Sequence, residues 1–430
     1  MALVWNMLNR IRNTYREFPS KFWTLVGASF IDGVGSTMIF PFFALYITHK
    51  FDVGMTEAGL LLGIFSVAGF FGGLMGGALT DRIGRKALML FGLIFSAVSS
   101  VSMGLVNVYV VFFPLVIAVG LLSDVAWPAQ SAMIADMLPE DQRPEGYGIL
   151  RVARNVSWMV GPTVAGLLAA QSYLLLFILD SISSIITAAI IYRLIPETMP
   201  ERSPEAKSES LAQTFRGYLK ALADGSFVSF LFISIIMNLV YIQLYSTFSV
   251  YLRDVHGIPT QGYGFLMSMN ATLVVLTQFS ITRWTKRYPA MIMLALGSAF
   301  YLTGFTMFGF VSAYAFFAIG MLLVTVGEMI VMPVAQALVA RLAPADMRGR
   351  YMATFSLAWT IPAAVGPMAA GVILDNFNPD LVWYLSGILE TFAVAGFLLL
   401  HLRLRMRLAS QSIPKPSRPL PAEPSHGDTG

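Results

Sequence analysis

The sequence has no cysteine, only four histidines and few charged residues, which make up 12% of its 430 positions. The lack of cysteine excludes disulfides, thiolate metal sites, cysteine nucleophiles and iron–sulfur clusters. Soluble domains carry about 25% charged residues, so this composition excludes an ordinary water-soluble globule. We find no Gly-Lys-Ser/Thr phosphate loop, no Ser-His-Asp arrangement and no paired carboxylates in a polar segment. We therefore expect no enzyme activity, no cofactor and no metal site.

Long apolar segments dominate the chain instead. Hydrophobic residues form 56% of it, and a membrane-spanning helix needs about 20 of them. Twelve spans would use about 240 residues, which matches the hydrophobic content. The apolar segments predict spans near 21–48, 56–80, 87–106, 109–135, 145–170, 173–193, 226–251, 262–282, 290–311, 313–340, 351–374 and 380–402. The sequence thus predicts an all-α membrane protein.

The basic residues predict how the chain crosses the membrane. If the N-terminus is inside, the inner links and both tails hold 24 of the 28 Lys and Arg, and the outer links hold only Lys50 and Arg253. Because basic residues concentrate on the cytoplasmic side, we expect both termini to be cytoplasmic in a plasma or inner membrane. The start lacks a secretory signal pattern, so the first span should remain in the mature protein.

An internal repeat divides the chain into two halves. A shift of 205 residues pairs Gly59 with Gly264 and carries Val160-Gly161-Pro162 onto Val365-Gly366-Pro367. Parallel repeats of this kind are typical of transporters that bind substrate near the midplane. The predicted units are a cytoplasmic segment 1–20, a six-helix half 21–193, a cytoplasmic linker 194–225, a second six-helix half 226–402 and a disordered tail 403–430.

The second span ends in a glycine-rich, charged stretch, Gly77-Ala78-Leu79-Thr80-Asp81-Arg82-Ile83-Gly84-Arg85-Lys86. It resembles the signature Gly-x-Leu-Ala-Asp-x-x-Gly-Arg-Lys of the major facilitator superfamily. The resemblance implies twelve transmembrane helices in two pseudo-symmetric six-helix halves. It also implies a cytoplasmic latch, in which Arg85 meets an acid that Asp136 can supply. The latch residues would be Gly77, Asp81, Arg82, Gly84, Arg85 and Asp136. On charge alone, the stretch could equally be a turn that only fixes the topology.

A helix-bend motif in the fifth span, Gly161, Pro162 and Gly166, partly resembles the antiporter signature of the same family. Ser157 and Leu167 replace two of the glycines of that signature. The match favours the drug:proton antiporter branch. The alternative is that these small residues only allow two helices to pack closely.

Five acids lie inside the predicted spans: Asp32, Asp124, Asp180, Glu328 and Glu390. Each costs at least about 2.5 kcal/mol at bilayer depth, so function is the default interpretation. In the family that the chain resembles, spans 1, 4, 7 and 10 line the cavity and spans 3, 6, 9 and 12 lie outside it. We therefore expect Asp32, Asp124 and Glu328 to couple protons or bind cations, and Asp180 and Glu390 to be structural.

Polar and aromatic residues inside the spans predict a substrate cavity, although each could instead serve packing. Arg154 could pair with an acid, whereas Arg151 is expected to reach the inner surface. Many proton-driven members of the family carry an arginine in the fourth span, and this chain has none there. The expected cavity residues are Ser36, Arg154, Asn155, Trp158, Asn238, Tyr241, Tyr245, Asn270, Gln278 and Trp359.

Together these features predict a secondary transporter that exports small apolar or cationic compounds in exchange for protons, as multidrug efflux proteins do. One alternative is a proton symporter or facilitator that imports a metabolite. The other is a sensor or lipid-handling membrane protein that does not transport. The expected partners are protons, a small-molecule substrate and the lipid bilayer. We expect no nucleic acid and a monomeric chain.

Overall fold

The computed structural model describes residues 16–123, 126–199, 219–344 and 347–411, and every regular element in these ranges is a helix. The first half contains α2 (Ser20–Ile39), the 3-10 turn η1 (Phe40–Phe42), α3 (Phe43–Phe51), α4 (Met55–Ile83), α5 (Arg85–Leu105), α6 (Tyr109–Ser123), α7 (Ala126–Met137), α8 (Arg143–Ala169) and α9 (Leu174–Leu194). The second half contains α11 (Gly225–Tyr241), the 3-10 turn η2 (Ile242–Tyr245), α12 (Thr247–Asp254), α13 (Thr260–Thr285), α14 (Ala290–Phe308), α15 (Tyr314–Leu342), α16 (Arg348–Phe355), α17 (Leu357–Asn376) and α18 (Leu381–Gln411).

These helices form the twelve predicted crossings. Within the described residues, ten segments are long and apolar enough to span a bilayer. The fourth crossing combines the short apolar helix α6 with α7. The fifth is α8, which has 27 residues but carries Arg151, Arg154 and Asn155 and is therefore less apolar. The arrangement is the twelve-helix, two-half fold that the sequence predicted.

The structure interrupts two predicted spans and extends the last one. The first crossing changes to a 3-10 turn at Phe40–Phe42, where Pro41 removes a backbone donor. The seventh crossing has a similar break at Ile242–Tyr245. The last helix does not end at residue 402, as predicted, but continues to Gln411. Arginine alternates there with leucine and methionine, and all three are good helix formers.

The halves meet along two helix pairs, which we call the α4/α17 seam and the α8/α13 seam. Both seams are close. A Cβ on Gly59 would lie 2.5 Å from the backbone of Pro367, and one on Gly264 would lie 2.6 Å from the carbonyl oxygen of Pro162. The shift of 205 residues relates these two contacts, so the sequence repeat is a spatial pseudo-symmetry.

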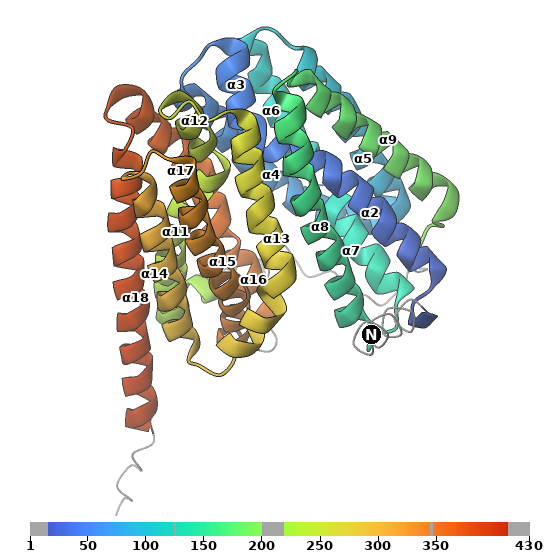
Figure 1. The fold of residues 1–430 in the computed structure, drawn as a ribbon. Coiled ribbons are helices and arrows are strands. Elements are labelled where there is room, and N and C mark those ends of the chain that lie inside the picture. The colour runs from blue at the N-terminus through green and yellow to red at the C-terminus, as the bar shows by residue number, and fades with distance from the viewer. Residues whose placement is uncertain (1–15, 124–125, 200–218, 345–346, 412–430) are drawn as a thin grey trace, which may run out of the picture.

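The two halves are joined at one end of the bundle and diverge at the other (Figure 1). Helices α3 and α12 lie at the joined end, which we call the closed end. Two cross-half contacts lie there: Arg253 binds Leu45 and Thr48, and Asp375 binds Met55. The end of α18 and the start of α2 lie at the opposite end, which we call the splayed end.

Candidate functional site

A cavity of about 290 Å³ lies in the first half, between α2, α5, α7, α8 and α9. We call it the Asp32 cavity. The Asp32 carboxylate accepts a hydrogen bond from Ser184 Oγ at 2.9 Å. The polar side chains that line the cavity are Ser29, Asp32, Ser36, Ser96, Gln130, Arg154 and Thr187. The structure therefore brings three of the predicted residues, Asp32, Ser36 and Arg154, to one cavity.

The polar face of α2 explains the position of this cavity. Ser29, Asp32 and Ser36 follow one another at intervals of three and four residues, so they share one side of the helix. From α7, the amide of Gln130 donates to Ser29 Oγ. The sequence analysis missed Gln130, although an amide two residues after Pro128 in the fourth span could have drawn attention to it.

A second cavity, of about 140 Å³, lies between the two halves, and we call it the Glu328 cavity. The Glu328 carboxylate accepts a hydrogen bond from Asn270 Nδ2 at 2.8 Å, and the same amide donates to Thr325 Oγ1 at 3.0 Å. The cavity is lined by Asn155 and Trp158 from α8 and by Tyr245, Asn270, Ala271, Val274 and Glu328 from the second half.

Three aromatic rings join the halves beside the Glu328 cavity. The ring centroids of Trp158 and Tyr245 lie 5.5 Å apart, and Phe40 lies 6.2 Å from Trp158 and 5.9 Å from Tyr245. Phe40 is the repeat counterpart of Tyr245 in the 205-residue shift, so the two rings meet across the pseudo-symmetry axis. The sequence analysis did not select Phe40 because phenylalanine is common in every span.

Four predicted cavity residues line neither cavity. Asn238 is buried and donates to Ala358 O at 2.8 Å, so it ties α11 to α17. Gln278 donates to Met329 O at 3.0 Å and thus ties α13 to α15. The Tyr241 hydroxyl lies 3.0 Å from that of Tyr245 and also faces the Glu328 carboxylate. Trp359 packs on Tyr241, with ring centroids 5.7 Å apart. Helical spacing could not show which of these side chains face a neighbouring helix.

The remaining acids inside the spans are buried in packed regions. Asp180 is 3% exposed and accepts a hydrogen bond from Ser100 Oγ. Glu390 is fully buried, and neither of its carboxyl oxygens has a hydrogen-bond partner among the described residues. Neither residue lines the Asp32 or the Glu328 cavity. Asp124 lies outside the described residues.

The predicted latch region forms a polar cluster at the splayed end. Arg85 Nε lies 3.0 Å from Asp136 Oδ2, and Thr198 Oγ1 donates to the same oxygen at 3.2 Å. Arg85 begins α5 directly after Gly84, whose φ of 103° favours glycine. The surroundings of Gly77, Asp81 and Arg82 lie outside the described part of the structure.

Glu197, which the sequence analysis did not select, caps α5 beside this cluster. Its carboxylate accepts the backbone N–H groups of Arg85 at 3.0 Å and Lys86 at 3.1 Å, and those of Thr198 and Met199. Partial burial by itself would raise the pKa of Glu197. The four N–H donors favour the charged form more strongly, so the pKa lies below its ordinary value.

The helix-bend motif lies at helix contacts. Pro162 is inside α8, and a Cβ on Gly161 would lie 2.1 Å from Thr37 Oγ1. A Cβ on Gly166 would lie 3.2 Å from Gln261 Cα, across the α8/α13 seam. These glycines therefore allow α8 to approach α2 and α13 closely.

Comparison with known proteins agrees with this fold. The family model described as Major Facilitator Superfamily matches residues 25–364 and 260–426. A "Na(+), Li(+), K(+)/H(+) antiporter" of Planococcus maritimus is 27% identical over 411 residues, which cover 87% of this chain and 94% of the relative. The "Multidrug resistance protein MdtH" of Shigella flexneri is 23% identical over 383 residues, which cover 87% of this chain and 93% of the relative.

Among solved structures, a mutant of the nucleoside transporter NupG matches with a TM-score of 0.77 at 13% identity, over 89% of this chain and 100% of the NupG chain. At this identity the likeness shows the fold alone. The family model, in contrast, covers most of the sequence, and its two matches together include both halves. The chain is therefore a multi-pass membrane protein that belongs to the Major Facilitator Superfamily of transporters.

Proposed function

We propose that this transporter exports small apolar or cationic compounds in exchange for protons by alternating access. The observation that carries the proposal is the Asp32 carboxylate, which lines a cavity inside the membrane-spanning bundle. A hydroxyl donor such as Ser184 leaves the charge of a carboxylate in place. A charge at this depth costs at least about 2.5 kcal/mol, so either a proton or a cationic substrate can stabilise the site in turn.

The Glu328 cavity adds a second part of the substrate site. It combines a carboxylate with the rings of Trp158 and Tyr245. Aromatic faces attract organic cations, and a nearby carboxylate adds charge attraction. This chemistry supports binding of an organic cation between the two halves, where alternating access can expose it to either side.

The distribution of basic residues supports an orientation in which the splayed end faces the cytoplasm. The conformation described above would then be inward-facing, and the Arg85–Asp136 pair would belong to the cytoplasmic latch. A reporter fused at Lys207 should be cytoplasmic and one fused at His256 should be external. Finding both reporters on the same side would contradict this orientation.

A second candidate function is exchange of alkali cations for protons. It is favoured by the carboxylate and hydroxyl oxygens that Asp32 and Ser184 offer to a hard cation. The relative from Planococcus maritimus carries the name of such an antiporter. The two candidates differ in the cation that competes with the proton, and not in the fold.

Flux through proteoliposomes with an imposed pH gradient tests the proposal. We expect a proton gradient to drive uphill movement of a cationic dye, and Asp32→Asn to abolish it. Glu390→Gln is the control because it changes a buried acid that lines neither cavity. Driven movement of Na⁺ or K⁺ without the dye would favour the second candidate. Movement of both solutes in the same direction would favour symport, and no flux of any compound would contradict transport itself.

A further inference from the structure

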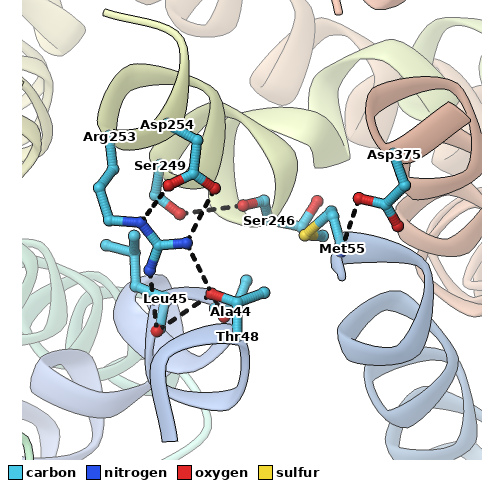
Figure 2. Close-up of polar contacts among 9 residues, drawn as sticks. All are labelled: Ala44, Leu45, Thr48, Met55, Ser246, Ser249, Arg253, Asp254 and Asp375. Atoms are coloured by element: carbon cyan, nitrogen blue, oxygen red, sulfur yellow. Dashed lines mark hydrogen bonds and ion pairs between the residues drawn. The ribbon is translucent and has the colours of Figure 1, made fainter. Parts of the chain in front are cut away.

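The N-terminus of α4 is capped by a residue from the other half (Figure 2). Gly54 precedes α4 and has no side chain with which to cap it. The carboxylate of Asp375, at the end of α17, takes that role. Its Oδ1 accepts the N–H of Met55 at 2.9 Å, and its Oδ2 accepts the N–H of Thr56 at 2.7 Å and the Thr56 hydroxyl at 2.6 Å. Because the first N–H groups of a helix lack intrahelical partners, this carboxylate satisfies two of them.

The cap fits tightly into the α4/α17 seam. A Cβ on Gly54 would lie 2.5 Å from Asp375 Oδ2, and one on Gly371 would lie 2.6 Å from the backbone of Met55 and Thr56. The seam therefore holds Asp375 against the first turn of α4. Any movement that separates α17 from α4 at this end breaks all three hydrogen bonds.

A second polar contact crosses between the halves at the same end. The Arg253 guanidinium of α12 lies 3.1 Å from Thr48 Oγ1 and 3.4 Å from the carbonyl oxygen of Leu45. Asp254 holds the guanidinium through two bonds of 2.6 and 2.9 Å (Figure 2). Arg253 contacts the first half through the carbonyl oxygen of Leu45 and the side chains of Thr48 and Tyr173. The Asp375 cap differs from this contact because it places a carboxylate on a helix N-terminus.

We propose that Asp375 is a removable N-cap of α4, which favours the conformation with a shut closed end and is released each time that end opens. A transporter that works by alternating access has to open each end in turn, and the two partners of this cap belong to different halves. Asp375 is thus a positioning residue of the transport cycle. The inference concerns the conformational equilibrium and does not depend on which substrate or ion is carried.

Distances between spin labels can test this equilibrium in the full chain in lipid nanodiscs, without substrate. Because the protein has no cysteine, introduced cysteines can be labelled without background. One pair of labels would replace Asn107 and Ser312, which are exposed at the closed end. A second pair would replace Ile83 and Tyr288, which are exposed at the splayed end. The shift of 205 residues relates the two members of each pair.

We expect Asp375→Ala to raise the ratio of long to short distances at the closed end by about twofold to thirtyfold, which is the range for loss of an N-cap. The ratio of long to short distances at the splayed end should fall by the same factor. Asp375→Asn should give a smaller shift in the same direction, because its remaining oxygen can still accept one of the N–H groups. Thr56→Val, which removes only the hydroxyl donor, should also give a small shift.

Asp380→Ala is the matched control. Asp380 is an acid at the same end, but it accepts its 2.7 Å hydrogen bond from Tyr251 inside the second half. We expect this variant to leave the label distances unchanged. Unchanged distances in Asp375→Ala, or an equal shift in Asp380→Ala, would overturn the proposal. Asp375→Ala could fail to fold. In that case, unchanged label distances in both Asp375→Asn and Thr56→Val would overturn the proposal. A failure of proton-coupled transport would leave these distances unaffected.

Discussion

The two halves share a backbone arrangement but carry many of their polar groups at different positions. The glycines that bring the seams together are kept, since Gly59 and Gly264 make equivalent contacts. Several polar groups inside or beside the bundle are not kept. The shift of 205 residues places Met237 opposite Asp32, Ala170 opposite Asp375 and Arg341 opposite Asp136. The repeat therefore accounts for the shape of the molecule, and the positions where the repeats differ carry its chemistry.

The first prediction separates the roles of the two halves and has the largest expected effect. Asp32→Asn should lower the rate of proton-driven transport at least about tenfold, a loss of about 1.4 kcal/mol or more, because the variant cannot exchange a charge for a proton. Glu328→Gln should instead raise KM for cationic substrates and keep the pH dependence, because Glu328 lies in the aromatic-lined cavity. Uptake at varied pH and substrate concentration measures both quantities.

The opposite result would reverse the comparison between the halves. If Asp32→Asn keeps its pH dependence while Glu328→Gln loses it, the second half couples the proton. Variants have to be compared at equal amounts of inserted protein, because a buried carboxyl can also affect folding.

The second prediction tests whether the two seams are equivalent. Gly59→Ala and Gly264→Ala would each place a Cβ within 2.6 Å of backbone atoms of the other half. We expect each variant to force the closed end apart and to lower stability by about 1–3 kcal/mol, as overpacking does. Thermal unfolding and the label pair at the closed end measure the two effects.

Gly148→Ala is the control for helix propensity, because no atom lies within 4 Å of a Cβ there. It should leave stability unchanged or raise it by up to about 1 kcal/mol. If only one of Gly59→Ala and Gly264→Ala loses much stability, the two seams contribute differently to the free energy of unfolding, although their backbones are related by the pseudo-symmetry.

The third prediction concerns a variant that gives the α8/α13 seam a carboxylate cap like that of the α4/α17 seam. Ala170 is the repeat counterpart of Asp375, and α13 begins at Thr260 after Pro259, which provides no side-chain cap. Ala170→Asp should therefore place a carboxylate near the first turn of α13 and stabilise the shut closed end by about 0.5–2 kcal/mol. We expect fewer long distances at the closed end and slower transport. Ala170→Asn should do the same with less salt dependence, whereas Ala170→Leu should do neither.

The sequence predicted the architecture because twelve apolar segments, the basic residues and the repeat are each strong signals. It also predicted that Arg85 and Asp136 would meet, through the family signature. It could not separate Asn155, which lines a cavity, from Asn238, which ties α11 to α17. Both are amides in apolar helices, and only packing decides which side of a helix faces a neighbour. Asp375 was overlooked for a similar reason, since its partners lie about 320 residues away along the chain.

The last prediction concerns acid sensitivity and has the smallest expected effect. Glu197 caps α5, whereas its repeat counterpart is Leu402 and α14 begins without a side-chain cap. Because the pKa of Glu197 is lowered in the folded protein, its contribution is complete above the ordinary glutamate pKa of about 4.3 and is lost as pH falls through the lowered value. Hydrogen exchange should therefore show the start of α5 opening in acid while the start of α14 does not respond. Glu197→Gln should remove this difference between the starts of α5 and α14. If both helix starts open equally in acid in the unmodified protein, the Glu197 cap does not cause the acid sensitivity of α5.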